Sequence, residues 1–209
     1  MEALKIFSQQ FLITLEGLVK MHHSIYRDVP PQGIYFERLV KEAFTRSSIP
    51  FTEVRATERN APKADIIVGG IRLSLKTETG EGTKENKITI TKLRTTEKGP
   101  WEAESLINHA LSHLSRYDYI LMLRAIWEKD KPVIHYQLVE IPIALLKKIE
   151  EAKLTKVERR KEKQSLAADI YDKDKKVFRV SFDATDGKCT IRNLQISECQ
   201  VLTTFGVRI

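Results

Sequence analysis

The order of apolar and polar positions predicts helices at the start of the chain and mostly strands after them. Apolar spacings of three and four residues are typical of helices, whereas strict alternation is typical of strands. Helices are expected near residues 2–22, 34–46, 101–116 and 142–152. Strands are expected at 51–56, 63–78 (as a hairpin), 87–93, 119–126, 133–139, 177–182 and 189–192. This order predicts a single α/β domain over residues 1–209, with a central mixed β-sheet flanked by helices.

The hairpin at 63–78 carries the most information about chemistry. Gly69-Gly70 separate two apolar, β-branched runs, which is a strong signal for a two-residue turn. If that turn joins paired strands, Asp65 lies directly opposite Ser74, and the two side chains share a face. Alternation adds three more polar side chains to this face, while the opposite face is apolar. They are Arg72, Lys76 and Glu78.

Composition and charge narrow the function classes. With 42% hydrophobic and 30% charged residues, the chain should be a globular, soluble protein. Its net charge of +7 favours an anionic partner such as nucleic acid. Cys189 and Cys199 match no metal-ligand or disulfide pattern, and neither a signal peptide nor a membrane span is evident. We therefore expect an intracellular location.

A carboxylate and an ammonium on one strand face are suited to metal-dependent cleavage of phosphodiesters. Mg²⁺ prefers oxygen ligands and keeps several waters, so Asp65 and the carbonyl of Leu75 could hold it. Lys76 could orient a water or stabilise the negative charge that develops on the phosphate. Taken alone, a simple surface ion pair between Asp65 and Lys76 is the more common interpretation.

The Asp65 … Ser74-Leu75-Lys76 arrangement resembles the PD-(D/E)XK nuclease superfamily, which includes type II restriction endonucleases. In that pattern an Asp on one strand is followed by (Asp/Glu)-x-Lys on the next. The resemblance covers residues 34–140, which would be the nuclease core. It implies a Mg²⁺-dependent, sequence-specific endodeoxyribonuclease of a prokaryotic, intracellular restriction-modification system. Such an enzyme would act on double-stranded DNA, and we expect it to do so as a homodimer.

The chain departs from the family pattern at Ser74, which replaces the middle carboxylate. Some members with Ser-x-Lys recruit a carboxylate from further along the chain, where this sequence has Thr89 and Ile90. The candidate replacements are Glu78, Glu37, Glu102 and Glu104. Glu78 is favoured by face geometry and Glu104 by the resemblance.

Basic residues around the predicted site are candidates for phosphate contacts, which would make DNA binding strongly dependent on salt. They are Lys63, Lys84, Lys87, Lys92 and Arg94. Each is equally well interpreted as an ordinary solvated charge. The basic run 153–163 is either a second DNA-binding arm or a solvated helix face. For the C-terminal hairpin region 167–209 we expect a role in DNA recognition or dimerisation.

Two other functions stay open from the sequence. Ser74 is compatible with a non-catalytic DNA-binding protein built on a decayed nuclease core. A DNA repair or junction nuclease of the same fold would carry the same residues.

Overall fold

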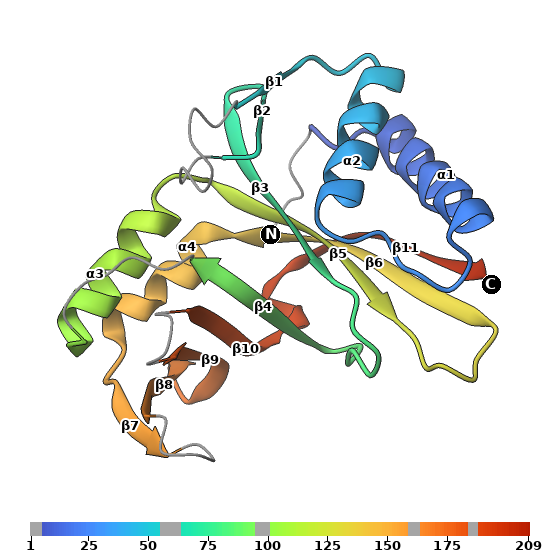
Figure 1. Cartoon of the computed structure of the whole chain (residues 1–209). Helices are drawn as coiled ribbons and strands as arrows, with labels where there is room; N and C mark the ends of the chain where they lie inside the picture. Colours follow the sequence, from blue (N-terminus) through green and yellow to red (C-terminus); the bar gives the residue numbers. More distant parts are fainter. Residues whose placement is uncertain (1–5, 55–63, 95–100, 159–163, 184–187) are drawn as a thin grey trace.

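Two β-sheets make up most of the molecule (Figure 1). The computed structural model describes residues 6–54, 64–94, 101–158, 164–183 and 188–209. The first sheet has six strands in the order β1-β2-β3-β5-β6-β11, of which β3 and β5 run parallel and all other neighbours antiparallel. Its strands are β1 (Phe51–Glu53), β2 (Ile66–Val68), β3 (Ile71–Glu78), β5 (Tyr119–Ile126), β6 (Val133–Pro142) and β11 (Gln200–Arg208).

The second sheet is antiparallel and has five strands in the order β4-β10-β9-β8-β7. Its strands are β4 (Lys87–Arg94), β10 (Cys189–Gln195), β9 (Lys175–Asp183), β8 (Gln164–Asp172) and β7 (Thr155–Glu158). β4 is the next strand after β3 in the chain and contacts it, so the two sheets meet beside the end of β3.

Helices cover the first sheet on the side away from the second (Figure 1). They are α1 (Gln9–Ile25) and α2 (Ile34–Arg46), whereas α3 (Ala103–Leu114) and α4 (Ile143–Leu146) lie near the second sheet. Short 3₁₀ turns follow at Lys147–Glu151 and Ile196–Glu198. Ser8 caps α1, because its side chain accepts a hydrogen bond from the Phe11 amide at 3.2 Å.

The core has two parts, one on each face of the first sheet. On the helix side, α1 and α2 bury aromatic side chains against β3, β5 and β6. On the other side, apolar side chains of both sheets pack against each other and against α3. Leu121 and Leu123 face the first part, while Ile120 and Met122 face the second. Burial on both faces explains why β5 reads as a continuous apolar run.

The fold class and most elements confirm the prediction. The helix at 34–46 and the strand at 119–126 have the predicted bounds. The terminal hairpin is confirmed by the pairing of Cys189 with Phe182, although its predicted Asp186-Gly187 turn lies outside the described residues.

Several features differ from the sequence prediction. The second sheet was not anticipated, and strands β8 and β11 were missed. The helix expected at 142–152 is the short α4 followed by a 3₁₀ turn. The basic run at 153–163 was interpreted partly as a helix face, but its described part contains strand β7; residues 159–163 lie outside the description. No helix within the described ranges is long and apolar enough to cross a membrane.

Candidate functional site

The turn between β2 and β3 places Asp65 beside Ser74, as predicted. Gly69 and Gly70 have φ angles of 56° and 82°, the left-handed backbone of a tight hairpin turn, so Val68 pairs with Ile71. The Asp65 amide donates to the carbonyl of Leu73 at 2.9 Å, which extends the pairing by one step beyond β2.

The Asp65 carboxylate is held by uncharged donors. Its Oδ2 accepts a hydrogen bond from the Leu75 amide at 2.5 Å and another from Ser74 Oγ at 3.2 Å. Ser74, which stands where the family pattern has a carboxylate, thus orients Asp65. Both of these described bonds end on the same oxygen of Asp65.

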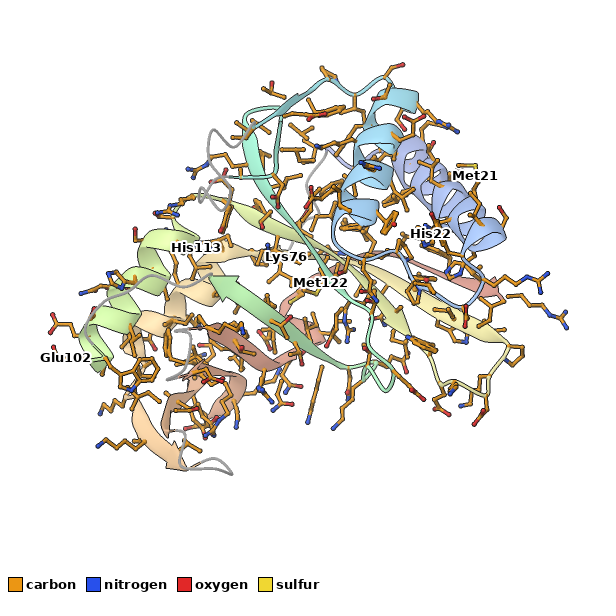
Figure 2. All side chains as sticks on the ribbon, viewed as in Figure 1. Met21, His22, Lys76, Glu102, His113 and Met122 are labelled. Atoms are coloured by element: carbon orange, nitrogen blue, oxygen red, sulfur yellow. The ribbon has the colours of Figure 1, made fainter. Side chains whose placement is uncertain are left out.

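A groove of about 850 Å³ opens along β3 beyond the end of β2. Leu75 and Lys76 line it from β3, Glu37 lines it from α2, and residues 80–83 close it on the side of β4. Figure 2 shows Lys76 near the end of α2, where β3 crosses the molecule. Lys76 and a residue of α2, a helix that precedes the hairpin in the chain, therefore line the same groove.

Glu37, on α2, lines the same groove as Lys76. Its pKa is raised above the ordinary glutamate value, first by burial and then by the nearby Asp65 carboxylate. The ammonium groups of Lys41 and Lys76 act in the opposite direction. Glu37 is thus within electrostatic range of both Asp65 and Lys76. The sequence analysis included Glu37 but favoured others; its place in the first turn of α2, next to the buried Phe36, was the available signal.

Glu78 lies on the same strand as Lys76 but has two strong partners. Its Oε2 accepts from Arg124 Nε at 2.7 Å, and its Oε1 accepts from the Thr89 amide at 2.8 Å. The Arg124 side chain is fully buried. These contacts make Glu78 part of the connection between β3, β4 and β5.

Glu104 lies apart from the groove. It is exposed in the first turn of α3 and lines a separate depression of about 340 Å³ with Glu102, Ser105, Asn108 and His109. Figure 2 shows Glu102 at the outer end of α3, far from Lys76 in this view. The structure therefore does not bring the α3 carboxylates to Lys76.

Arg72 shares the predicted face with Asp65 but is engaged elsewhere. Its guanidinium donates to both carboxylate oxygens of Asp118, at 2.8 and 3.2 Å. The hydrogen bond from Arg72 lowers the pKa of Asp118. Asp118, which sequence reasoning missed, thus closes one end of the polar face. Burial and the Asp65 charge raise the pKa of the neighbouring Tyr117.

The predicted phosphate-contact residues are only partly described. Lys84 is exposed in the segment that joins β3 and β4, and Lys87 is partly buried at the start of β4. Lys63 and the side chains of Lys92 and Arg94 lie outside the description.

The donor set at the groove consists of oxygen atoms. In the described ranges, no group of three or more His, Cys, Asp or Glu side chains has the arrangement of a metal site. Glu37 and Leu75 line the groove, and the Asp65 carboxylate lies within electrostatic range of Glu37. Carboxylate and carbonyl oxygens are ligands of the kind that Mg²⁺ takes while keeping several waters.

Comparison with known proteins points in the same direction. A family model described as SmaI, type II site-specific deoxyribonuclease, matches residues 2–206. The chain is 30% identical over 199 residues to the type II restriction enzyme SmaI of Serratia marcescens, covering 94% of this chain and 79% of that protein. No solved structure matches the chain significantly.

Proposed function

We propose, because the chain belongs to the SmaI family of type II site-specific deoxyribonucleases, that Asp65, Glu37 and Lys76 form its catalytic site. Enzymes of this type cleave double-stranded DNA and generally use a divalent metal ion. The observation that carries the proposal is that Glu37, which lines the groove together with Lys76, lies within electrostatic range of both Lys76 and Asp65. We further assign the site to the PD-(D/E)XK superfamily, with Glu37 in the role of the carboxylate missing at Ser74.

The metal would be Mg²⁺, held by Asp65, Glu37 and the carbonyl of Leu75. When bound, such a cation neutralises charge on the phosphate and makes a bound water more acidic. The lining of the groove supports a bound cation, because Glu37, Glu78 and Glu81 lie there beside a single described ammonium, that of Lys76. A bound cation would favour the close approach of a phosphate oxygen to these acidic side chains.

The remaining groups of the site position and stabilise. The Leu75 amide and the Ser74 hydroxyl fix the orientation of the Asp65 carboxylate. The Lys76 ammonium would donate to a phosphate oxygen and stabilise the negative charge that develops there during attack by water. A cation bound beside Glu37 would favour its ionised form, which burial and the Asp65 charge disfavour.

The proposal includes a homodimer. The described residues hold one Asp65–Lys76 site, whereas cutting both strands of a duplex symmetrically needs two. The outer face of α1 is the surface we assign to a second copy. Ile13, Met21 and Ile25 are 54%, 50% and 71% exposed and lie on one side of the helix, with Gly17 between them. Figure 2 shows Met21 on the outer side of α1.

Charge supports the same surface. The only charged side chains of α1, Glu16 and Lys20, pair with each other at 2.6 Å. Depletion of unpaired charge is typical of the core of an interface between proteins. Sedimentation of Met21→Lys should show a monomer where the unaltered chain is a dimer, and the variant should nick plasmid DNA more than it linearises it. A dimer that persists in this variant would exclude α1 as the interface.

The experiment that tests the proposed function is digestion of bacteriophage DNA by the pure protein, with Mg²⁺ or with EDTA. Discrete fragments with Mg²⁺ alone are expected. Intact DNA in both, with retarded migration on a native gel, would support a non-catalytic DNA-binding protein instead. Cleavage restricted to mismatched or branched duplexes would indicate a repair or junction nuclease; family membership favours the type II activity over both.

A further inference from the structure

Arg124 is a buried cation that does not belong to the catalytic groups. It lies in the middle of β5 with its side chain fully buried. All five N–H donors of its guanidinium are used, at donor–acceptor distances of 2.5 to 2.9 Å. The acceptors are Glu78, Gln137 and the main-chain carbonyls of Lys84, Glu85 and Lys87. Burying an arginine is costly unless its donors are satisfied in this way. The same hydrogen bonds hold the five acceptors in fixed positions around the guanidinium.

Three of the five acceptors belong to one stretch of backbone, the segment Thr79–Asn86 and the first residue of β4. Other bonds tie the same segment down. Trp127 donates from Nε1 to the carbonyl of Thr79 at 3.1 Å and accepts at its own carbonyl from the Gly82 amide at 3.3 Å. The carbonyl of Asn86 accepts from the Ile196 amide at 3.2 Å. A loop of this length is ordinarily among the more mobile parts of a protein, and here its backbone is fixed along its length.

Apart from the buried Thr79, the residues of this segment are exposed or half-buried. Gly80, Glu81, Gly82 and Thr83 line the groove together with Lys76 and Glu37. Glu81, Lys84, Glu85 and Asn86 are exposed. The fixed backbone thus presents hydrogen-bonding side chains beside the catalytic groups.

The charges of the segment distinguish base contacts from phosphate contacts. Lys84 is its one cation, whereas Glu81 and Glu85 are anions. A loop that served only to bind phosphates would be basic, because carboxylates are repelled by the DNA backbone. Carboxylates, amides and ammonium groups together match base edges, where amino groups donate and ring nitrogens or carbonyls accept.

We propose that Thr79–Asn86 is a base-reading loop of this enzyme and that Arg124 is the residue that positions it. The ligand is the set of base edges exposed in a groove of duplex DNA. The inference rests on the proposed nuclease function, since it places the loop against the same DNA that the Asp65 site cleaves. A fixed backbone suits direct readout, because hydrogen bonds to bases discriminate only when the donors and acceptors are held in place.

The test compares loop variants with a matched pair of charge variants elsewhere. The test variants are Glu81→Gln and Lys84→Ala. The controls are Glu128→Gln and Lys131→Ala, an exposed ion pair in the turn between β5 and β6. The cleavage site is first mapped on bacteriophage DNA. Single-turnover cleavage is then measured on a duplex with that site and on duplexes with one base pair changed.

We expect a loop variant to lower the ratio of cleavage rates on the intact and altered sites roughly 10- to 100-fold. The controls should leave this ratio unchanged. The salt dependence of binding should also stay the same in a loop variant, because no phosphate contact is lost. Equal losses on all duplexes with a weaker salt dependence would make Lys84 a phosphate contact and overturn its assigned role. Loss of all cleavage and of metal binding in Glu81→Gln would make Glu81 a metal ligand instead.

Positioning by Arg124 is tested with Arg124→Lys, and with Trp127→Phe in case the first variant does not fold. Each removes hydrogen bonds to the segment while leaving its exposed side chains intact. Amide hydrogen exchange over 79–87 should become faster, and discrimination should fall, while Mg²⁺ still raises the melting temperature. Unchanged discrimination in a variant with faster exchange would overturn the role of Arg124. If the unaltered enzyme cut no DNA at all, the proposed function would fail and this inference with it.

Discussion

Asp65 and Glu78 lie on one polar face of the β2–β3 hairpin and β3, yet the fold uses them differently. Asp65 is held through one oxygen by a main-chain amide and a serine hydroxyl, and no ion pair in the described part of the chain includes it. Glu78 uses both oxygens, one of them on the buried guanidinium of Arg124. A metal cation at Glu78 would have to compete with the Arg124 guanidinium. A metal cation at Asp65 would meet a carboxylate whose described hydrogen-bond donors are all uncharged. The partner of a carboxylate, more than its face, therefore decides whether it is available for catalysis.

The largest loss of DNA cleavage should come from removing the charge of Asp65 or of Lys76. Asp65→Asn keeps an acceptor for the Leu75 amide, and Lys76→Ala removes the ammonium and the stem of a side chain that is only half-buried, so both should fold. Each should lower the rate of DNA cleavage about 1000-fold, because each removes charge aimed at the reacting phosphate. DNA binding in EDTA should persist.

Gel assays of cleavage and filter binding measure both quantities. Ser74→Ala is the matched control, because it removes one hydrogen bond to Asp65 but leaves the bond from the Leu75 amide. It should lose about 10-fold, as expected for a supporting contact. Full cleavage by Asp65→Asn would remove the assigned site.

Glu78→Ala should show the opposite profile, a large loss of stability without loss of metal binding. It leaves a buried arginine without its carboxylate, which costs about 3–5 kcal/mol. Urea unfolding in EDTA measures this loss, and the Mg²⁺-induced rise in melting temperature reports on metal binding. Glu128→Ala, in an exposed ion pair, is the control and should change the free energy of unfolding by less than about 1 kcal/mol. A stable Glu78→Ala that no longer binds metal would reverse the comparison.

Glu37→Gln tests whether Glu37 is the second carboxylate that binds the metal beside Asp65. It should reduce cleavage about 10- to 100-fold at a fixed Mg²⁺ concentration, because one ligand is weakened while Asp65 remains. It should also reduce the Mg²⁺-induced rise in melting temperature. An unchanged Mg²⁺ response would return the choice of the replacement carboxylate to the other candidates.

The pH dependence of Glu37 has a definite sign. A pKa raised in the folded protein means that Glu37 contributes to stability below its unfolded pKa, and that this contribution is lost as pH rises through the folded pKa. In EDTA, Glu37→Gln should therefore melt at a higher temperature than the unaltered chain at neutral pH, and the difference should shrink in acid. In Mg²⁺, the metal requirement of the unaltered chain should rise as pH falls, since the metal needs the ionised form. Melting curves across pH, in each buffer, check both trends; a difference that grows in acid would contradict the assigned shift.

Local pattern was enough to predict the hairpin and its register, because the Gly69-Gly70 turn and the alternation of β2 and β3 are local properties. It was not enough to identify the partner of each carboxylate. Arg124 reaches Glu78 across a parallel strand pair, and its position within an apolar strand gave no sign of this contact. Likewise β11 and the second sheet depend on pairing between segments far apart in the chain, which periodicity does not reveal. Local sequence therefore indicated the polar face that we propose as catalytic, while long-range packing determined which acidic side chains are paired and which lie near Asp65.

The smallest effect is expected at Glu104, the candidate that family resemblance favoured. Its side chain is exposed on α3 and lines a depression separate from the groove of Lys76. An exposed charge that far from the reacting phosphate is screened by water and salt. Glu104→Gln should thus change neither the single-turnover cleavage rate nor the Mg²⁺ response by more than about twofold, and surface substitutions of this kind alter stability by about 0.5 kcal/mol or less. Measured beside Glu37→Gln under the same conditions, it separates two acidic helix residues by their distance from Asp65. A loss of cleavage at Glu104→Gln equal to that at Glu37→Gln would mean that α3 moves to the groove when DNA binds.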